Sequence, residues 1–212
     1  MGRRALRKID PGLDLTRWLI AEEALPTPLS SELLFGRTAP LQIEVGSGKG
    51  LFLAHATASL PAHDFLGIEI AAKYARFAAA RLARCACANG KVVHGDGVRI
   101  FHDRLADQSV EAVHVYFPDP WWKRRHRRRR VMHAAFLRDV ERVLRVGGAL
   151  HFWTDVAEYY QTTLELVRQT TQLNGPVIPA ERPSEHDLDY QTHFERRMRL
   201  NDLPVYRSEF RK

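Results

Sequence analysis

The chain has few of the residues or runs that would tie it to a membrane, a disulfide framework or a metal. Only two of its 212 residues are cysteines, Cys85 and Cys87. Their separation places them on different faces of a helix, which fits neither a disulfide framework nor a zinc site. No apolar run approaches the roughly 20 residues of a membrane span. The ten histidines include no pair at metal-ligand spacing, so we expect no bound metal.

The N-terminus also lacks the marks of a targeting segment. Residues 1–8 are basic but lead into no hydrophobic stretch, so no signal peptide is predicted. Leu6 occupies the position at which a myristoylation signal requires Ser or Thr. Together with the scarcity of cysteine, these features predict a protein of the reducing cytoplasm.

Positive charge, by contrast, is present in excess. The net charge is +7 and the isoelectric point is about 9.7, which favours a polyanionic partner. Seven of the eight residues from Lys123 to Arg130 are Lys or Arg. Such a run can be a solvated face or a localisation signal. However, it leads into a predicted helix start, where cations oppose the helix dipole, so we expect it to bind a polyanion.

From residue 41 onward, short apolar runs alternate with helical patterns. Strands are predicted over 41–45, 65–70, 91–94, 110–117, 149–153 and 205–210, and helices over 49–60, 71–88, 98–105, 131–144 and 156–171. Gly147-Gly148 is predicted to stop the fourth of these helices. The alternation predicts an α/β fold with a doubly wound, Rossmann-like, mostly parallel sheet, helices on both faces and an antiparallel last strand. We expect residues 41–212 to form this domain and residues 1–40 to be an N-terminal extension.

An acidic residue stands at or just after the end of each of the first five predicted strands. These residues are Glu44, Glu69, Asp96, Asp119 and Asp155. In open α/β sheets the ligand lies outside the carboxyl ends of the strands. Each acid alone could be a turn or helix-start residue. Five carboxylates at one edge would repel one another without partners, so they indicate a ligand rich in hydroxyls, amines and positive charge.

The first strand leads into a glycine-rich turn, Gly46-Ser47-Gly48-Lys49-Gly50. Glycines let the backbone approach a ligand closely. A dinucleotide pattern would need its third glycine at position 51, which is leucine, and this argues against an NAD enzyme. Glu44 disfavours a pyrophosphate, whereas Glu69 can hold ribose hydroxyls. Together these features predict an adenosine ligand with a positive head, such as S-adenosylmethionine.

The fourth strand leads into Phe117-Pro118-Asp119-Pro120-Trp121-Trp122, directly before the basic run. The two prolines restrict the backbone on both sides of the aspartate, which favours a fixed position for its carboxylate. Either Trp121 or Trp122 could stack on a base or pack beneath the turn, and the sequence does not distinguish these alternatives.

The motifs resemble those of known enzymes. Glu44-x-Gly46-x-Gly48-x-Gly50, with Glu69 and Asp96, is similar to the class I S-adenosylmethionine-dependent methyltransferases. More specifically, the chain from about residue 42 to the C-terminus resembles the tRNA (guanine-N7-)-methyltransferases. That resemblance rests on three motifs: the proline-bracketed Asp119 with Lys123, Arg125 and His126; Thr154-Asp155; and Thr192-x-Phe194-Glu195-Arg196.

The resemblance implies methyl transfer from S-adenosylmethionine to N7 of a guanosine, nucleotide 46, in the variable loop of tRNA, with S-adenosylhomocysteine as the other product. It implies that Asp119 acts in catalysis. It implies a cofactor site lined by Glu44, Gly46, Gly48, Gly50, Glu69, Asp96 and Asp119. It also implies substrate contacts from Lys123, Asp155, Thr192, Phe194 and Glu195. For the RNA backbone we expect contacts from Arg124, Arg125, Arg127, Arg128, Arg129 and Arg130.

Guanine N7 carries a lone pair and no proton, so its methylation needs no general base, and catalysis should rest on positioning and electrostatics. Two other functions stay open. A methyltransferase of small molecules or proteins is disfavoured because the order here is Pro-Asp-Pro-Trp rather than Asp-Pro-Pro-Tyr. A non-catalytic RNA-binding protein is disfavoured by the intact acidic rim. We expect tRNA as partner and no membrane; the sequence does not distinguish a monomer from a homodimer.

Overall fold

The structure is a computed structural model that describes residues 8–179 and 192–212; of Arg124, Arg127 and His193 it describes the backbone alone. Residues 1–7 of the predicted extension lie outside the described residues. Every helix in the described ranges is too short or too polar to span a bilayer.

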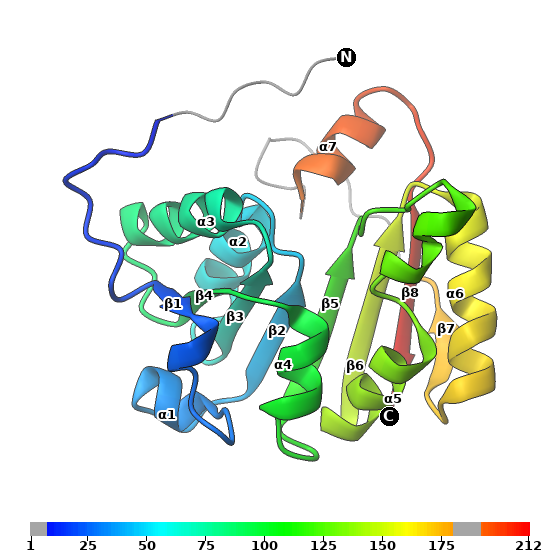
Figure 1. The fold of residues 1–212 in the computed structure, drawn as a ribbon, viewed down its shortest axis with the longest axis horizontal. Helices are drawn as coiled ribbons and strands as arrows, with labels where there is room; N and C mark the ends of the chain where they lie inside the picture. Colours follow the sequence, from blue (N-terminus) through cyan, green and yellow to red (C-terminus); the bar gives the residue numbers. More distant parts are fainter. Residues whose placement is uncertain (1–7, 180–191) are drawn as a thin grey trace.

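A single sheet organises the described residues, with the strand order β1-β4-β3-β2-β5-β6-β8-β7 (Figure 1). Its strands are β1 (Leu19–Ala21), β2 (Leu41–Val45), β3 (Asp64–Glu69), β4 (Gly90–His94), β5 (Val110–Tyr116), β6 (Leu144–Thr154), β7 (Asn174–Val177) and β8 (Tyr206–Arg211). Strands β1 to β6 pair in parallel, whereas β8 is antiparallel to β6 and β7. The predicted fold class, with its antiparallel last strand, is confirmed.

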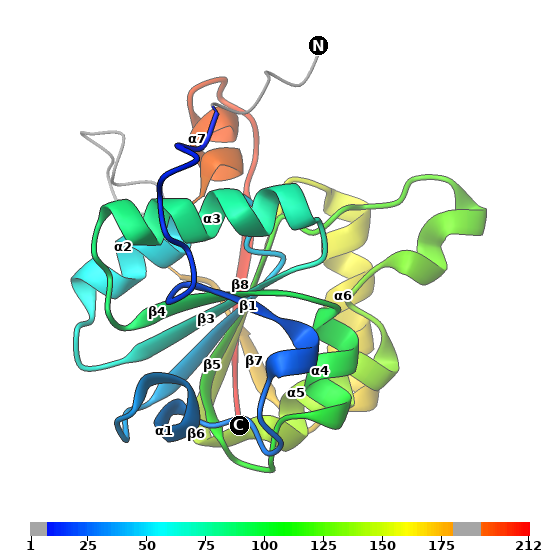
Figure 2. The ribbon, with the colours of Figure 1, turned by 60° about the vertical axis from the view of Figure 1, so that its left-hand side comes forward.

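Helices cover both faces of the sheet, and α7 lies over the carboxyl ends of its strands (Figure 1 and Figure 2). They are α1 (Ser31–Phe35), α2 (Leu51–Ser59), α3 (Ala72–Arg84), α4 (Gly97–Asp103), α5 (Ala134–Val143), α6 (Ala157–Thr170) and α7 (His193–Arg199), with 3-10 turns η1 (Glu22–Ala24) and η2 (Arg124–Arg129). Helices α2 and α3 pack on one face around Phe52 and Phe65. Helices α4, α5 and α6 pack on the other around Phe101, Phe136 and Phe152. Burial of these apolar faces is the main term that stabilises the fold.

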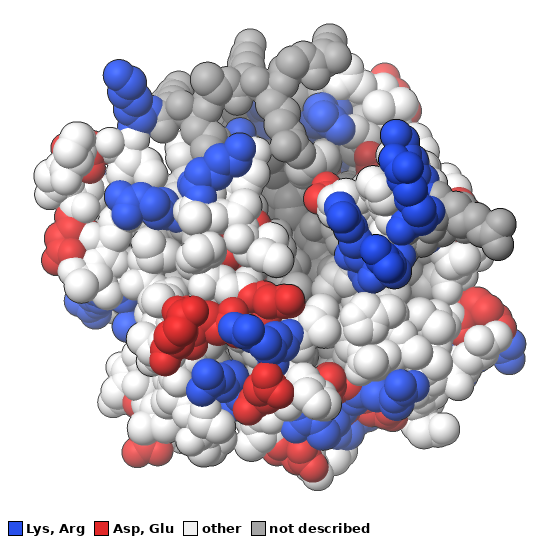
Figure 3. All heavy atoms as spheres, viewed as in Figure 1, with Lys and Arg blue, Asp and Glu red and all other residues white. Residues whose placement is uncertain are grey.

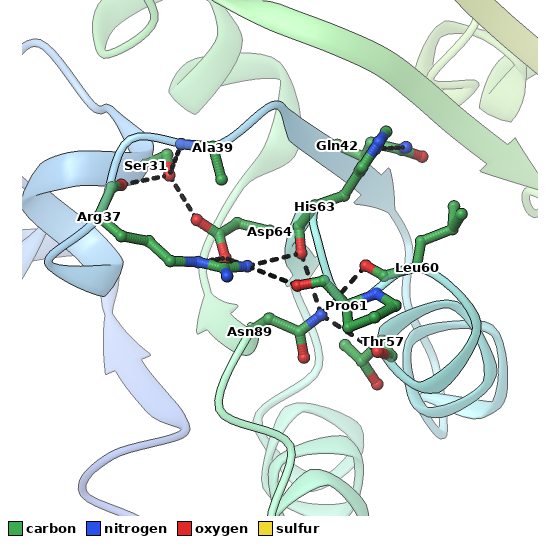
Figure 4. A network of polar contacts seen from close by, with 10 residues as sticks. All are labelled: Ser31, Arg37, Ala39, Gln42, Thr57, Leu60, Pro61, His63, Asp64 and Asn89. Atoms are coloured by element: carbon green, nitrogen blue, oxygen red, sulfur yellow. Dashed lines mark hydrogen bonds and ion pairs between the residues drawn. The ribbon is translucent and has the colours of Figure 1, made fainter.

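The stretch before residue 40 supplies structure that its weak periodicity does not reveal. Strand β1 adds to the sheet edge, in parallel with β4. Helix α1 begins after Ser30, whose hydroxyl accepts from Leu33 N at 3.2 Å, and ends at Gly36 in the left-handed region. Beyond α1, Arg37 Nη2 lies 2.6 Å from Asp64 Oδ1 at the start of β3 (Figure 4). The described residues before position 41 are therefore joined to the sheet by strand pairing and by an ion pair with a buried carboxylate.

The predicted stop at Gly147-Gly148 is wrong. Helix α5 ends at Val143, and β6 begins with the next residue, so the two glycines lie inside the strand. Gly147 has φ of +79°, and a Cβ on Gly148 would lie 2.8 Å from Arg145 O and 2.9 Å from Glu111 O. The register between β5 and β6 shifts at this point. The glycines therefore allow an irregular, close pairing of two strands rather than a helix end.

Helix α3 also ends earlier than predicted, at Arg84 instead of residue 88. Ala86 has a positive φ of 50°, which turns the chain toward β4. Cys85 and Cys87 consequently lie in the connection after the helix, and both are free thiols.

Candidate functional site

The carboxyl ends of the parallel strands meet at one edge of the sheet, beneath α7 (Figure 1). All five predicted acids lie there. Glu44 is in β2 and Glu69 is the last residue of β3, while Asp96, Asp119 and Asp155 follow β4, β5 and β6. Parallel pairing puts these strand ends in register, for example Glu69 opposite His94 and Tyr116 opposite Trp153. The fold thus gathers these carboxylates, far apart in the sequence, along one rim.

The glycine-rich turn after β2 leaves open space at its surface. Gly46, Gly48 and Gly50 all have positive φ, at 82°, 52° and 66°. A Cβ on Gly46 would meet nothing within 4 Å, and one on Gly48 would meet only Gly46 O at 3.9 Å. A Cβ on Gly50, by contrast, would lie 2.8 Å from Ala78 Cβ in α3. Gly46 and Gly48 therefore offer room for a ligand, whereas Gly50 allows α2 to pack closely on α3.

Glu44 is a buried carboxylate with one oxygen left without a hydrogen-bond partner in the described part of the chain. Its side chain is buried, and its Oε2 has no hydrogen-bond partner among the described residues. Burial and the nearby charge of Glu69 raise the pKa of Glu44 well above its usual value of 4.5. Ser47 Oγ, in the adjoining turn, is likewise buried and unpartnered within the described part of the chain. A ligand with a positively charged amine would supply the missing partner.

Glu69 is held by backbone amides on both sides. Its Oε2 accepts from Gly48 N and its Oε1 from Ala71 N, each at 2.8 Å. These two bonds lock the glycine turn to the end of β3, and each oxygen keeps a free lone pair for a ligand hydroxyl. An amine-binding acid, an open turn and a fixed hydroxyl acceptor together fit S-adenosylmethionine.

Glu22 of η1 belongs to this half of the site, although no motif in the sequence marks it. It is buried, and its Oε2 accepts from the backbone N of Asp96 at 2.9 Å, while its Oε1 lies 2.5 Å from Arg99. Asp96 in turn accepts from Val98 N at 2.9 Å and caps α4. The backbone at Asp96 is therefore fixed by a residue from the N-terminal extension. Only the pairing of β1 with β4, which no local pattern predicts, brings the two together.

The proline-bracketed turn has an unusual backbone. Phe117 and Trp121 have positive φ, at 50° and 44°, a region that costs a non-glycine residue about 1–2 kcal/mol. Phe117 N donates to Trp153 O at 2.8 Å, which ties the start of the turn to β6. Asp119 itself is exposed between the two strained positions. The turn thus presents its carboxylate outward from a constrained backbone.

Exposed cations follow this turn and gather on one side of the rim, over η2 (Figure 3). Lys123, Arg125, Arg128 and Arg129 are exposed, and the side chains of Arg124 and Arg127 lie outside the described residues. The run itself forms the 3-10 turn η2, and α5 begins only at Ala134, after the N-cap His133. The helix dipole therefore acts less directly on the run than the predicted start at residue 131 implied.

The two tryptophans differ in their surroundings. The Trp121 ring meets His126 edge-on at 5.8 Å, and the Arg129 guanidinium lies 5.1 Å from its centroid. Trp122 is 66% exposed. Trp121 therefore packs against residues of its own loop, whereas the ring of Trp122 is exposed and available to stack on a ligand.

Arg130 departs from the expectation of an RNA contact. Its side chain is only 9% exposed, and it bonds to Pro120 O and to Glu158 of α6. Its position at the end of the basic run suggested a phosphate contact, but the fold turns it inward.

Helix α7 brings the late motif to the same edge. Thr192 caps the helix by accepting from Glu195 N at 3.0 Å. Phe194 stacks on Phe117 with ring centroids 5.8 Å apart, beside the proline-bracketed turn. Glu195 differs from the prediction of a direct substrate contact, because it is 3% exposed and its Oε1 lies 3.3 Å from Arg207 Nη2 of β8. Asp155, after β6, is partly exposed.

Comparisons with known proteins agree with this geometry. A sequence model of a family described as "Putative methyltransferase" matches residues 38–208. A tRNA (guanine-N(7)-)-methyltransferase of Rhodopirellula baltica is 51% identical, over all of this chain and 80% of that protein. One from Xylella fastidiosa is 36% identical, over 78% of this chain and 68% of that protein. Among solved structures, the aminoglycoside resistance methyltransferase NpmB1 aligns with a TM-score of 0.53 at 17% identity, over 81% of this chain and 86% of that one, which shows the fold alone.

Proposed function

We propose that this chain, which belongs to the tRNA (guanine-N7-)-methyltransferase family, transfers a methyl group from S-adenosylmethionine to N7 of a guanosine in the variable loop of tRNA. The observation that carries the proposal is the buried Glu44 carboxylate beside the open glycine turn, whose Oε2 has no partner among the described residues. It lies at the same sheet edge as the exposed cations of η2. The choice of tRNA and of N7 rests on the family. Since tRNA is its substrate, we place the reaction in the cytoplasm.

The acidic half of the rim would hold the cofactor. Glu44 would accept from the ammonium group, Glu69 from the ribose hydroxyls, and Asp96 from the adenine end. Gly46 and Gly48 give the cofactor room to approach the backbone. Gly50 supports the turn through its packing on α3.

Bound S-adenosylmethionine supplies a methyl group on a positively charged sulfur. The N7 lone pair forms the new bond to the methyl carbon as the carbon–sulfur bond breaks, so the positive charge passes to the guanine ring. No proton moves in this step. Asp119, exposed on its constrained turn, can orient the base and stabilise the positive charge that develops on it.

The basic half would hold the tRNA. Lys123 and the arginines of η2 other than Arg130 would contact phosphates, which provide most of the sequence-independent affinity. Asp155 after β6, and Thr192 and Phe194 at the start of α7, would contact the guanosine; of these, Phe194 stacks on Phe117 beside the proline-bracketed turn. Glu195 would act through its ion pair with Arg207, which joins α7 to β8.

Transfer of a labelled methyl group to unmodified tRNA, followed by mapping of the modified base, tests the proposal. We expect label at N7 of one guanosine in the variable loop. As a matched control, a tRNA with adenosine at that nucleotide should accept no label. Label at another atom, or in the control tRNA to the same extent, would refute the assignment.

A further inference from the structure

Arg130 points into the protein and makes several contacts there, although it belongs to a run of mostly exposed cations. Its Nε donates to Pro120 O at 2.8 Å. Its Nη1 and Nη2 donate to the two carboxylate oxygens of Glu158, at 3.4 and 2.9 Å. The guanidinium carbon lies 4.4 Å from the ring centroid of Tyr159. All three nitrogens are thus engaged, and the guanidinium lies over an aromatic ring of α6.

The surroundings favour a fixed cation at this point. Burial raises the pKa of Tyr159 to about 12, so the ring stays neutral, and its hydroxyl accepts from Met132 N at 3.4 Å. A fork-shaped guanidinium matches a carboxylate with two parallel hydrogen bonds while its plane stacks on an aromatic ring, and a lysine cannot form the two-pronged contact. Glu158 is 43% exposed, so the ion pair is reached by solvent on one side only. Three of the five guanidinium N–H groups of Arg130 thus bond inside the protein, and its side chain is only 9% exposed.

The carbonyl that Arg130 holds belongs to the residue next to Asp119. This turn contains positive φ values at Phe117 and Trp121. A strained backbone persists only where surrounding contacts determine it. At its start, the turn is fixed by the bond from Phe117 N to Trp153 O. At its other end, Arg130 links Pro120 to α6, so the strained segment is held from both sides.

We propose that Arg130 is a positioning residue: with Glu158 and Tyr159 it fixes the Pro118-Asp119-Pro120 turn so that the Asp119 carboxylate faces the reacting guanine. The inference rests on the proposed function, in which Asp119 stabilises the charge on the methylated base. A shift of about 1 Å in a catalytic group can cost on the order of 100-fold in rate. Loss of the clamp should therefore lower kcat and leave the affinities for both ligands intact.

The test compares Arg130→Met with Arg128→Met, a nearby exposed cation. We expect Arg130→Met to lower kcat at least about tenfold. Its Kd for S-adenosylmethionine by calorimetry, its Kd for tRNA and the salt dependence of tRNA binding should each stay within twofold of wild type. Arg128→Met should show the opposite pattern, with weaker tRNA binding and a flatter salt dependence. Arg130→Lys should restore less than half of the lost activity, since it lacks the two-pronged contact.

A double-mutant cycle with Glu158→Gln keeps the inference testable if Arg130→Met is unstable. Because Glu158 is partly exposed, its substitution should leave the protein folded, with a several-fold fall in kcat. The double variant should lose no more activity than Arg130→Met alone, because the two residues act through one contact. Additive losses, or a raised Kd for tRNA with a flattened salt slope in Arg130→Met, would overturn the inference.

Hydrogen exchange separates failure of this inference from failure of the proposed function. Amide protons of residues 117–123 should exchange at least tenfold faster in Arg130→Met than in wild type, whatever the substrate is. If wild-type protein does not methylate tRNA but exchange is faster, the proposed function fails and the clamp stands. If exchange is unchanged, the clamp is refuted even when methylation of tRNA is confirmed.

Discussion

The two halves of the rim are built in different ways. On the side of β2, β3 and β4, the functional carboxylates lie at strand ends or in short turns. Backbone amides hold two of them, since Glu69 accepts from Gly48 and Ala71 and Asp96 accepts from Val98, while Glu44 Oε2 has no partner among the described residues. On the side of β5 and β6, the functional groups lie on a long turn, on η2 and on α7, and side chains from distant elements fix them. Arg130 reaches α6, and Glu195 reaches β8.

The difference matches the ligands. A small cofactor with one positive centre needs a few buried acceptors at fixed distances, which strand ends provide. A large polyanion needs exposed charge spread over a surface, which loops provide at little cost in buried polar groups. Asp119 lies where the two halves meet. It is exposed, like the cations of the basic half, and negatively charged, like the residues of the acidic half. We therefore expect each half to bind its ligand independently, with Asp119 at the boundary contributing chiefly to transfer.

The largest expected effect comes from Asp119→Ala. Removing a group that stabilises developing charge typically costs 100- to 1,000-fold in kcat, and we expect a loss of this size or more. Asp119 is exposed, so the fold should survive, as thermal unfolding would verify. Asp103→Ala, an exposed acid at the end of α4, serves as the matched control and should retain wild-type rates. Methyl transfer within tenfold of wild type by Asp119→Ala would remove Asp119 from its assigned role.

The next largest effect concerns cofactor binding by the acidic half. Glu44→Gln should weaken binding of S-adenosylmethionine about tenfold or more, because a hydrogen bond to a charged group contributes about 1.5–3 kcal/mol. Calorimetry measures this change directly. Cofactor binding by wild-type protein should also release a proton, because a positive ligand favours the ionised carboxylate, and the released proton is detected by comparing buffers of different ionisation enthalpy. Unchanged affinity in Glu44→Gln would contradict the assigned role.

The same residue predicts a pH dependence of stability. The raised pKa of Glu44 means that the cofactor-free folded protein keeps a proton that the unfolded chain releases above its usual value of 4.5. Between that value and the raised folded pKa, the folded state binds more protons, so the free energy of unfolding falls as pH rises. Glu44→Gln should flatten this slope in denaturant titrations at pH values above 4.5. A slope identical to that of wild type would show that Glu44 is ionised in the folded protein.

On the basic half, substitution of Arg125, Arg128 and Arg129 together by Gln should weaken tRNA binding at least about tenfold. The slope of log affinity against log salt should also become shallower, by about 0.7–0.9 for each phosphate that is no longer neutralised. Filter binding across a salt series measures both. A tRNA affinity that changes without any change in salt slope would mean that the three arginines act through the fold rather than through phosphates.

The smallest expected effect tests a residue that joins the extension to the acidic half. Glu22→Gln keeps the size of the side chain but removes the charge that holds Asp96 N and Arg99. We expect a loss of cofactor affinity of a few-fold, corresponding to about 1 kcal/mol. Glu23→Gln, an exposed neighbour, is the control. Equal affinities for the two variants would limit Glu22 to a structural role.

Features that are encoded locally were predicted best from the sequence. Alternating apolar runs and helical patterns predicted the sheet, and acids at strand ends predicted the acidic rim, because both signals are confined to a few neighbouring residues. The sequence also predicted the glycine-rich turn, although one of its glycines, Gly50, allows close helix packing instead of ligand approach.

What escaped prediction depends on contacts between distant segments. Arg130 and Glu195 resembled substrate contacts within their motifs, but their partners Glu158 and Arg207 come from α6 and β8. Glu22 carries no motif at all, and only the pairing of β1 with β4 brings it to Asp96. Gly147-Gly148 resembled a helix stop, yet it serves an irregular strand pairing that only the sheet register defines.

The most direct test of two separate halves is the Kd for S-adenosylmethionine of the variant in which Arg125, Arg128 and Arg129 are replaced by Gln, measured by calorimetry without tRNA. We predict a value within twofold of wild type in a protein whose tRNA binding is at least about tenfold weaker. Loss of cofactor affinity in parallel with loss of tRNA affinity would contradict this separation, because the two halves would then form one coupled surface.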